Sequence, residues 1–149
     1  MWNDIGIKLM PFKRSPARSS TRGSALTPGK AVGDWAEQQA KKYLLDRGLV
    51  FWQGNYRCKL GEIDLIMHDQ DTIVFVEVRS RKQNRYGTAL ESVNRGKQQR
   101  LIRAAKYYLQ KNKLTEQKPC RFDVVSVDNT HTLDELAIQW IPNAFTVNY

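Results

Sequence analysis

The chain has 149 residues, of which 41% are hydrophobic, and this length and composition suit one domain with one core. It has no run approaching the roughly 18–20 apolar residues of a membrane-spanning helix, so we expect no membrane partner. The two cysteines, Cys58 and Cys120, form no C-x-x-C pair, and with two histidines a zinc site of the usual spacing is disfavoured. This cysteine usage fits a reduced, cytoplasmic protein, and the alternative is a single disulfide between the two.

The net charge of +9 is concentrated in two segments. Residues 1–30 carry +5 and residues 79–113 carry +10, which leaves −6 for the remainder. A block as basic as the second favours a polyanionic partner, and we take nucleic acid as that partner. The plainer alternative is a solvated helix face. The candidate nucleic-acid-binding residues are Arg81, Lys82, Arg85, Arg95, Arg100 and Arg103.

The first segment, residues 1–30, is rich in Ser, Arg, Pro and Gly and has no hydrophobic period. It is predicted to be a basic disordered tail, although its composition also resembles a transit peptide. Residues 31–149 are predicted to form a single domain. Residues 32–47 predict its first helix, and Gly48 is the expected stop.

The rest of the chain alternates between strand-like and helix-like patterns. Three strand-like segments rich in aromatic and branched residues precede a long amphipathic helix, and two more strands follow it. The predicted ranges, in that order, are 49–57, 61–68, 72–80, 89–112, 120–128 and 136–141. This order indicates a mixed α/β sandwich.

Two acids interrupt predicted strands. Asp64 stands in an apolar run, and Glu77 stands between two valines. An ionised carboxylate in a sheet core costs several kcal/mol unless something pairs with it. Alternation along a strand places Glu77 and Arg79 on one face. If Met67 lies opposite Thr72 in a tight hairpin, Asp64 is diagonal to Glu77 on that same face.

Two converging carboxylates repel, and a divalent cation removes the repulsion. Magnesium takes one or two carboxylates and keeps other positions for water and phosphate oxygens. Such an ion can lower the pKa of a bound water, and a neighbouring cation such as Arg79 can steady phosphate charge. The alternative is structural: Arg79 and Arg81 pair with Glu77, Glu62 and Asp64.

The stretches "GEIDLI", "VFVEVRSR" and "CRFDVV" resemble the YraN-like uncharacterised bacterial family, within the PD-(D/E)-x-K nuclease superfamily. The resemblance runs from about Gly33 to Phe145. It implies a restriction-endonuclease-like αβββαβ core, with a mixed sheet flanked by helices and a metal at one sheet edge. It further implies a Mg²⁺- or Mn²⁺-dependent endonuclease that acts on nucleic acid phosphodiesters, with DNA favoured.

By the same resemblance, Asp64 matches the superfamily's metal-binding Asp, and Glu77 matches the acid of its E-x-K pair. Glu37 matches the helix Glu of the resolvase-like branch, which makes it a third candidate metal ligand. Glu37 also fits a capping box with Asp34 and a pair with Lys41 at i+4.

Arg79 departs from the superfamily, which usually has Lys at this position. Arginine keeps its proton in proteins, so Arg79 cannot act as a base. Lys97, on the apolar stripe of the second predicted helix, could compensate, and the alternative is a lysine snorkelling at the edge of that stripe. The catalytic candidates are therefore Glu37, Asp64, Glu77, Arg79 and Lys97.

Two other functions stay open. One is a catalytically inactive nucleic-acid-binding module of the same fold, which Arg79 favours. The other is a protein-binding adaptor whose basic helix meets an acidic partner. The oligomeric state is also open, with a dimer among the options.

Overall fold

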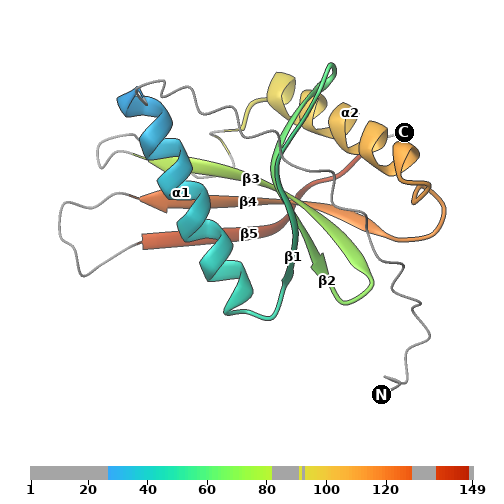
Figure 1. The fold of residues 1–149 in the computed structure, drawn as a ribbon, viewed down its shortest axis with the longest axis horizontal. Coiled ribbons are helices and arrows are strands. Elements are labelled where there is room, and N and C mark those ends of the chain that lie inside the picture. Colours follow the sequence, from blue (N-terminus) through green and yellow to red (C-terminus); the bar gives the residue numbers. More distant parts are fainter. Residues whose placement is uncertain (1–26, 82–90, 92, 129–136, 148–149) are drawn as a thin grey trace, which may run out of the picture.

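A computed structural model describes residues 27–81, 91, 93–128 and 137–147 of the chain. Within these residues a five-stranded sheet, in the order β1-β2-β3-β4-β5, lies between two helices (Figure 1). The elements are α1 (Pro28–Leu45), β1 (Val50–Cys58), β2 (Gly61–Asp69), β3 (Thr72–Arg81), α2 (Arg95–Lys111), β4 (Cys120–Asp128) and β5 (Ala137–Phe145). The predicted α/β class and the predicted order of elements are confirmed.

The sheet is mixed. β1, β2 and β3 pair antiparallel, β3 and β4 pair parallel, and β5 returns antiparallel to β4. Parallel neighbours need a long crossover connection, and α2 lies in the connection between β3 and β4. This arrangement agrees with a restriction-endonuclease-like core.

Each helix covers one face of the sheet, and alternate residues of β3 divide between the two faces. Val74 and Val76 pack with Ala36, Ala40 and Leu44 of α1 in one cluster. Ile73 and Phe75 belong to a second cluster with α2, whose members include Leu101, Ala104 and Tyr108. The period-2 pattern of strands thus builds two cores on a single sheet.

Both helices begin elsewhere than the sequence predicts. α1 starts at Pro28 rather than at residue 32, because Thr27 is extended and Pro28 has its φ already fixed for the first helical position. Residues 28–30 therefore belong to the helix, and residues 1–26 of the predicted tail lie outside the described residues. α2 starts at Arg95 rather than at residue 89, because the Asn94 side chain caps it by accepting from the Lys97 N–H at 2.9 Å.

The hairpin between β2 and β3 has a register two residues from the predicted one. Met67 pairs with Val74, and Asp69 pairs with Thr72, so the turn needs two residues rather than four. Gln70 adopts a φ of 52° in that turn. An offset of two residues keeps every side chain on its predicted face, so the parity argument for Asp64 and Glu77 holds.

No helix among the described residues is long and apolar enough to cross a membrane. Cys58 and Cys120 are both free thiols.

Candidate functional site

The two acids that interrupt the strands come together on the α2 side of the sheet. The carboxyl groups of Asp64 and Glu77 lie close enough to interact electrostatically. Glu77 has only 3% of its side chain exposed. Burial, and next the charge of Asp64, raises the pKa of Glu77 to about 7. Burial likewise raises the pKa of Asp64. At neutral pH the pair therefore resists carrying two negative charges.

Asp64 reaches this position where the ladder between β2 and β3 ends. The last backbone pair on this side joins Leu65 and Val76. Beyond it, Oδ2 of Asp64 accepts a hydrogen bond from the Val78 N–H at 2.8 Å. The Asp64 carboxylate thus accepts the bond that a backbone carbonyl of β2 would accept if the β2–β3 pairing continued.

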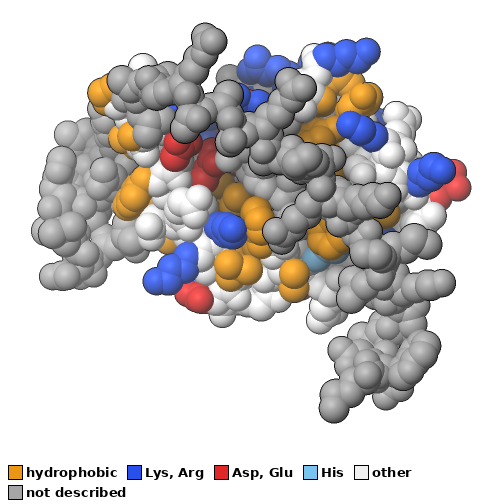
Figure 2. Space-filling view, in the orientation of Figure 1, with side chains coloured by type: hydrophobic (Ala, Val, Ile, Leu, Met, Phe, Trp, Pro, Cys, Tyr) orange, Lys and Arg blue, Asp and Glu red, His pale blue; other side chains and the backbone are white. Residues whose placement is uncertain are grey.

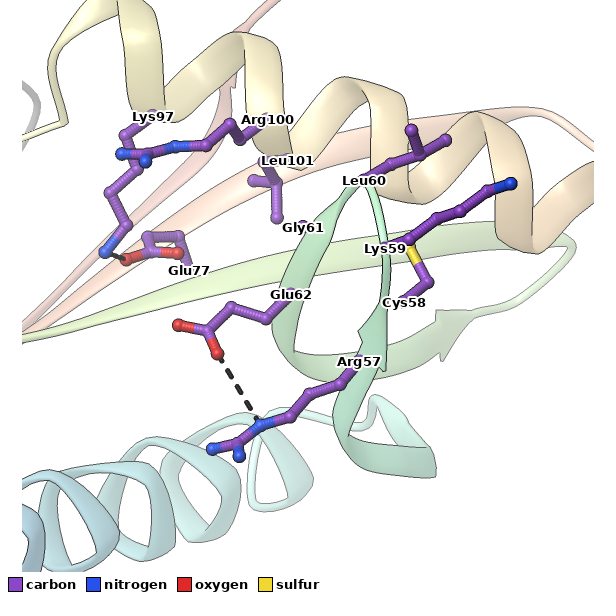
Figure 3. A pocket seen from close by; sticks show the side chains of 10 residues that line it. All are labelled: Arg57, Cys58, Lys59, Leu60, Gly61, Glu62, Glu77, Lys97, Arg100 and Leu101. Carbon is purple, nitrogen blue, oxygen red and sulfur yellow. Dashed lines mark ion pairs between the residues drawn. The ribbon is translucent and has the colours of Figure 1, made fainter.

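Lys97 and Arg79, the two cations predicted for the site, both lie beside Glu77. Nζ of Lys97 forms an ion pair with Oε1 of Glu77, and Nη1 of Arg79 lies 3.7 Å from the same oxygen. Figure 3 shows the Lys97 side chain running from α2 down to the carboxylate. Asn94 contributes indirectly, because its cap fixes the first turn that carries Lys97. Lys97 therefore stands closer to the Glu77 carboxylate than Arg79 does.

The structural pairing expected for Arg79 is also present, since Arg79 contacts Glu77. Glu62, in contrast, pairs with Arg57 of β1 at 3.6 Å rather than with a β3 arginine. This exposed pair is worth little to stability.

Glu37 lies within electrostatic reach of the acid pair and has a partner of its own. Its Oε2 accepts a hydrogen bond from Nδ2 of Asn55 at 2.9 Å. Burial, and next the charge of Asp64, raises the pKa of Glu37. The alternatives for Glu37 are wrong: Asp34 lies inside α1 and caps nothing, and Lys41 sits over the ring of Phe51 at 3.5 Å.

The fit of a divalent ion depends on this donor set. Among the residues that the structure describes, no three His, Cys, Asp or Glu side chains form a group that could hold a metal. Asp64 and Glu77 still offer the hard oxygen donors that Mg²⁺ prefers. Burial, and next the charge of Asp64, raises the pKa of Glu77, and a divalent ion would remove the repulsion between the two acids. The oxygen donors of Asp64 and Glu77 therefore suit a magnesium ion, whereas Glu37 is hydrogen-bonded to Asn55.

A pocket of about 520 Å³ opens beside Glu77, between the tip of the β1–β2 hairpin and the first turns of α2. Four cations line it: Arg57 and Lys59 from the hairpin, and Lys97 and Arg100 from the helix (Figure 3). A buried acid thus stands beneath a basic rim.

The predicted nucleic-acid-binding residues separate into groups. Arg100 lines the pocket beside Glu77, whereas Arg95 and Arg103 line a second hollow of about 670 Å³, against residues 145–147. Basic side chains are spread along α2 in the space-filling view (Figure 2). Arg81 ends β3, opposite Asp128 in register. Lys82 and Arg85 lie outside the described residues.

Two basic residues of the pocket, Arg57 and Lys59, were missed because they precede the basic block at residues 79–113. The signal that could have found them is the run "RCKLG" at residues 57–61, where two cations stand at the predicted turn between two strands.

Arg121 and Asp123, in contrast, form a structural network. Asp123 is fully buried and accepts from Nε of Arg121 at 3.0 Å, from Nε1 of Trp140 at 3.0 Å and from the Asn143 N–H at 2.8 Å. These bonds satisfy the carboxylate within the protein.

Comparison with known proteins places the chain in a family. Residues 36–127 match the model of an uncharacterised protein family, UPF0102. The chain is 50% identical to a UPF0102 protein of Nitrosococcus oceani over 115 residues, which cover 77% of this chain and 91% of that protein. It is 47% identical to a UPF0102 protein of Pseudomonas putida over 130 residues, covering 87% and 98% of the two chains. The matched range contains the acid pair, Lys97 and both walls of the pocket.

Proposed function

The chain belongs to the uncharacterised protein family UPF0102, and we propose that it is a metal-dependent nuclease that hydrolyses phosphodiester bonds in nucleic acid, with DNA as the favoured substrate. The observation that carries the proposal is the pair of buried Glu77 and part-buried Asp64 beside Lys97, at a pocket with a basic rim. A pair of acids whose pKa values are raised by burial, next to a cleft and specific charge partners, marks a candidate catalytic site.

One feature of the site argues against a purely structural ion pair. The structural acid Asp123 has its carboxylate satisfied by hydrogen bonds from Arg121, Trp140 and the Asn143 N–H. Glu77 instead stands against a second acid, and burial together with the charge of Asp64 raises the pKa of Glu77, so its ionised form is disfavoured. Retaining such a cost is typical of sites whose arrangement serves chemistry.

In this function Asp64 and Glu77 would hold Mg²⁺ or Mn²⁺. The bound ion supplies a water of lowered pKa and neutralises charge on the phosphate. Lys97 binds an oxygen of Glu77 and also lines the pocket, so its ammonium group can meet a phosphate oxygen there. Arg79 keeps its proton and can stabilise negative charge, but it cannot accept a proton from water.

A second candidate, a nucleic-acid-binding module without chemistry, is favoured by one specific contact. Lys97 already pairs with the Glu77 oxygen that a metal ion would use. If that ion pair persists when magnesium is added, the protein itself neutralises the acids, and the cations of the pocket rim bind nucleic acid without cleavage.

The test is cleavage of labelled single-stranded, duplex and branched DNA with Mg²⁺ or Mn²⁺, normalised to the folded fraction. The wild type should cut at least one substrate, and Glu77→Gln and Asp64→Asn should each lose on the order of 10²-fold or more. Glu116→Gln is the matched control, since Glu116 is exposed and far along the chain from the site. Calorimetry should detect a bound divalent ion in the wild type and none in Glu77→Gln. Absence of cleavage with every substrate would replace the nuclease by the binding module.

A further inference from the structure

The pocket beside Glu77 has two walls, the β1–β2 hairpin tip and α2, which are in direct contact at Gly61. At the hairpin tip, a Cβ added to Gly61 would lie 2.9 Å from the backbone oxygen of Arg100, so the tip packs directly against the helix. Gly61 also has a φ of 155°, at the edge of the range that favours glycine. The tip therefore cannot approach α2 more closely, and its contact with the helix fixes the width of the pocket.

Both walls carry cations, and the reactive acid is recessed between them. Lys59 and Arg100 are exposed at the rim, one from the hairpin and one from the helix. Glu77, in contrast, has 3% of its side chain exposed. The pocket volume of about 520 Å³ falls within the size of sites that enclose one small molecule. A phosphodiester that reaches Glu77 must therefore leave the rim and enter a space of that size.

Double-stranded and single-stranded nucleic acid differ in their ability to do this. A duplex is stiff over about 150 base pairs, and bending even a short site costs free energy. A single strand bends freely, and it can track a positively charged groove with its backbone. Only the flexible form brings one phosphate down between two fixed walls without deforming a helix.

We propose that this pocket is selective for an unpaired strand, either a single strand or the single-stranded arm of a branched molecule, and that Lys59 and Arg100 clamp its backbone from the two walls. This inference deepens the proposed nuclease function and rests on it for the role of Glu77. The clamp itself depends only on the pocket and its cations.

The test is fluorescence anisotropy with the Glu77→Gln protein, which should bind without cutting. The probes are a labelled single strand, its blunt duplex, and the same duplex with a single-stranded flap. We expect the single strand and the flap to bind at least about 10-fold more tightly than the duplex. A Lys59→Ala/Arg100→Ala variant should lose this preference, and its slope of log affinity against log salt should fall by about 1.4, or about 0.7 for each lost phosphate contact. The matched control is Lys111→Ala/Lys113→Ala, which removes two exposed cations at the other end of α2 and should keep the preference.

Equal affinity for the duplex and the single strand would overturn the inference, as would an unchanged preference in the Lys59→Ala/Arg100→Ala variant. Its failure is distinguishable from failure of the nuclease proposal. Wild-type protein that cuts the interior of blunt duplex as fast as single strand keeps the nuclease and removes the selectivity. Protein that cuts nothing but shows the preference, with its dependence on Lys59 and Arg100, keeps the selectivity and removes the nuclease.

Discussion

Replacing Glu77 by glutamine should remove a pH dependence of folding that the buried acid creates. The pKa of Glu77 is about 7 in the folded protein, against 4.5 as its ordinary value. Between these two pH values the folded protein holds a proton that the unfolded chain has released. Stability from this group is therefore fully present below pH 4.5, and it is lost as the pH rises towards 7.

The size of the effect follows from the shift. One pKa unit corresponds to about 1.4 kcal/mol, so a shift from 4.5 to about 7 corresponds to about 3 kcal/mol. Solvent screening does not reduce this figure much, because 3% of the Glu77 side chain is exposed. Since a domain of this size is stable by about 5–15 kcal/mol, the change should be readily measured.

The assay is urea unfolding of wild type and Glu77→Gln at pH 4.5 and pH 8, without divalent ions. The free energy of unfolding of the variant, relative to wild type, should rise by about 3 kcal/mol between the two pH values. Glu116→Gln, at an exposed position, should follow the wild type at both pH values. If Glu77→Gln also follows the wild type, Glu77 is not held near a second acid, and the argument for a cation site fails with it.

Other expected outcomes concern the cations, the tail and the hairpin tip. If the protein is a nuclease, Arg79→Lys should keep or raise the cleavage rate, because Arg79 stabilises charge rather than taking a proton. Arg79→Ala should lose on the order of 10²-fold in that rate. An unchanged rate per folded molecule in Arg79→Ala would show that Arg79 is only a structural partner of Glu77. Binding to nucleic acid should weaken steeply with salt, and deletion of residues 1–26 should weaken it without abolishing it, because the cations of α2 stay in place; a flat salt profile would contradict binding through this basic surface. Gly61→Ala should lower the free energy of unfolding by about 1–3 kcal/mol in urea, since its Cβ would meet the Arg100 backbone oxygen at 2.9 Å; a variant as stable as the wild type would show that the tip is not held against α2.

The sequence by itself determined the elements and the face that each side chain occupies. Alternation along β2 and β3 placed Asp64 and Glu77 on one face of the sheet. That prediction is correct although the register differs by two residues from the predicted one, because only a shift by an odd number of residues moves a side chain to the other face. The helical period placed Lys97 on the stripe of α2 that faces the sheet. These features are local, and short-range periodicity is enough to read them.

The tertiary structure alone decided which of these residues meet. Lys97 and Arg79 were both candidates for the place beside Glu77, and the structure pairs Lys97 with it while Arg79 stands farther away. The pocket could not be predicted from local patterns, because Arg57 and Lys59 of its hairpin wall are some 40 residues in sequence from the helix that faces them. No local sequence pattern predicts that these two segments are neighbours. Their contact depends on Gly61, where the hairpin tip packs on α2, and the packing of the whole sheet against the helix sets that contact.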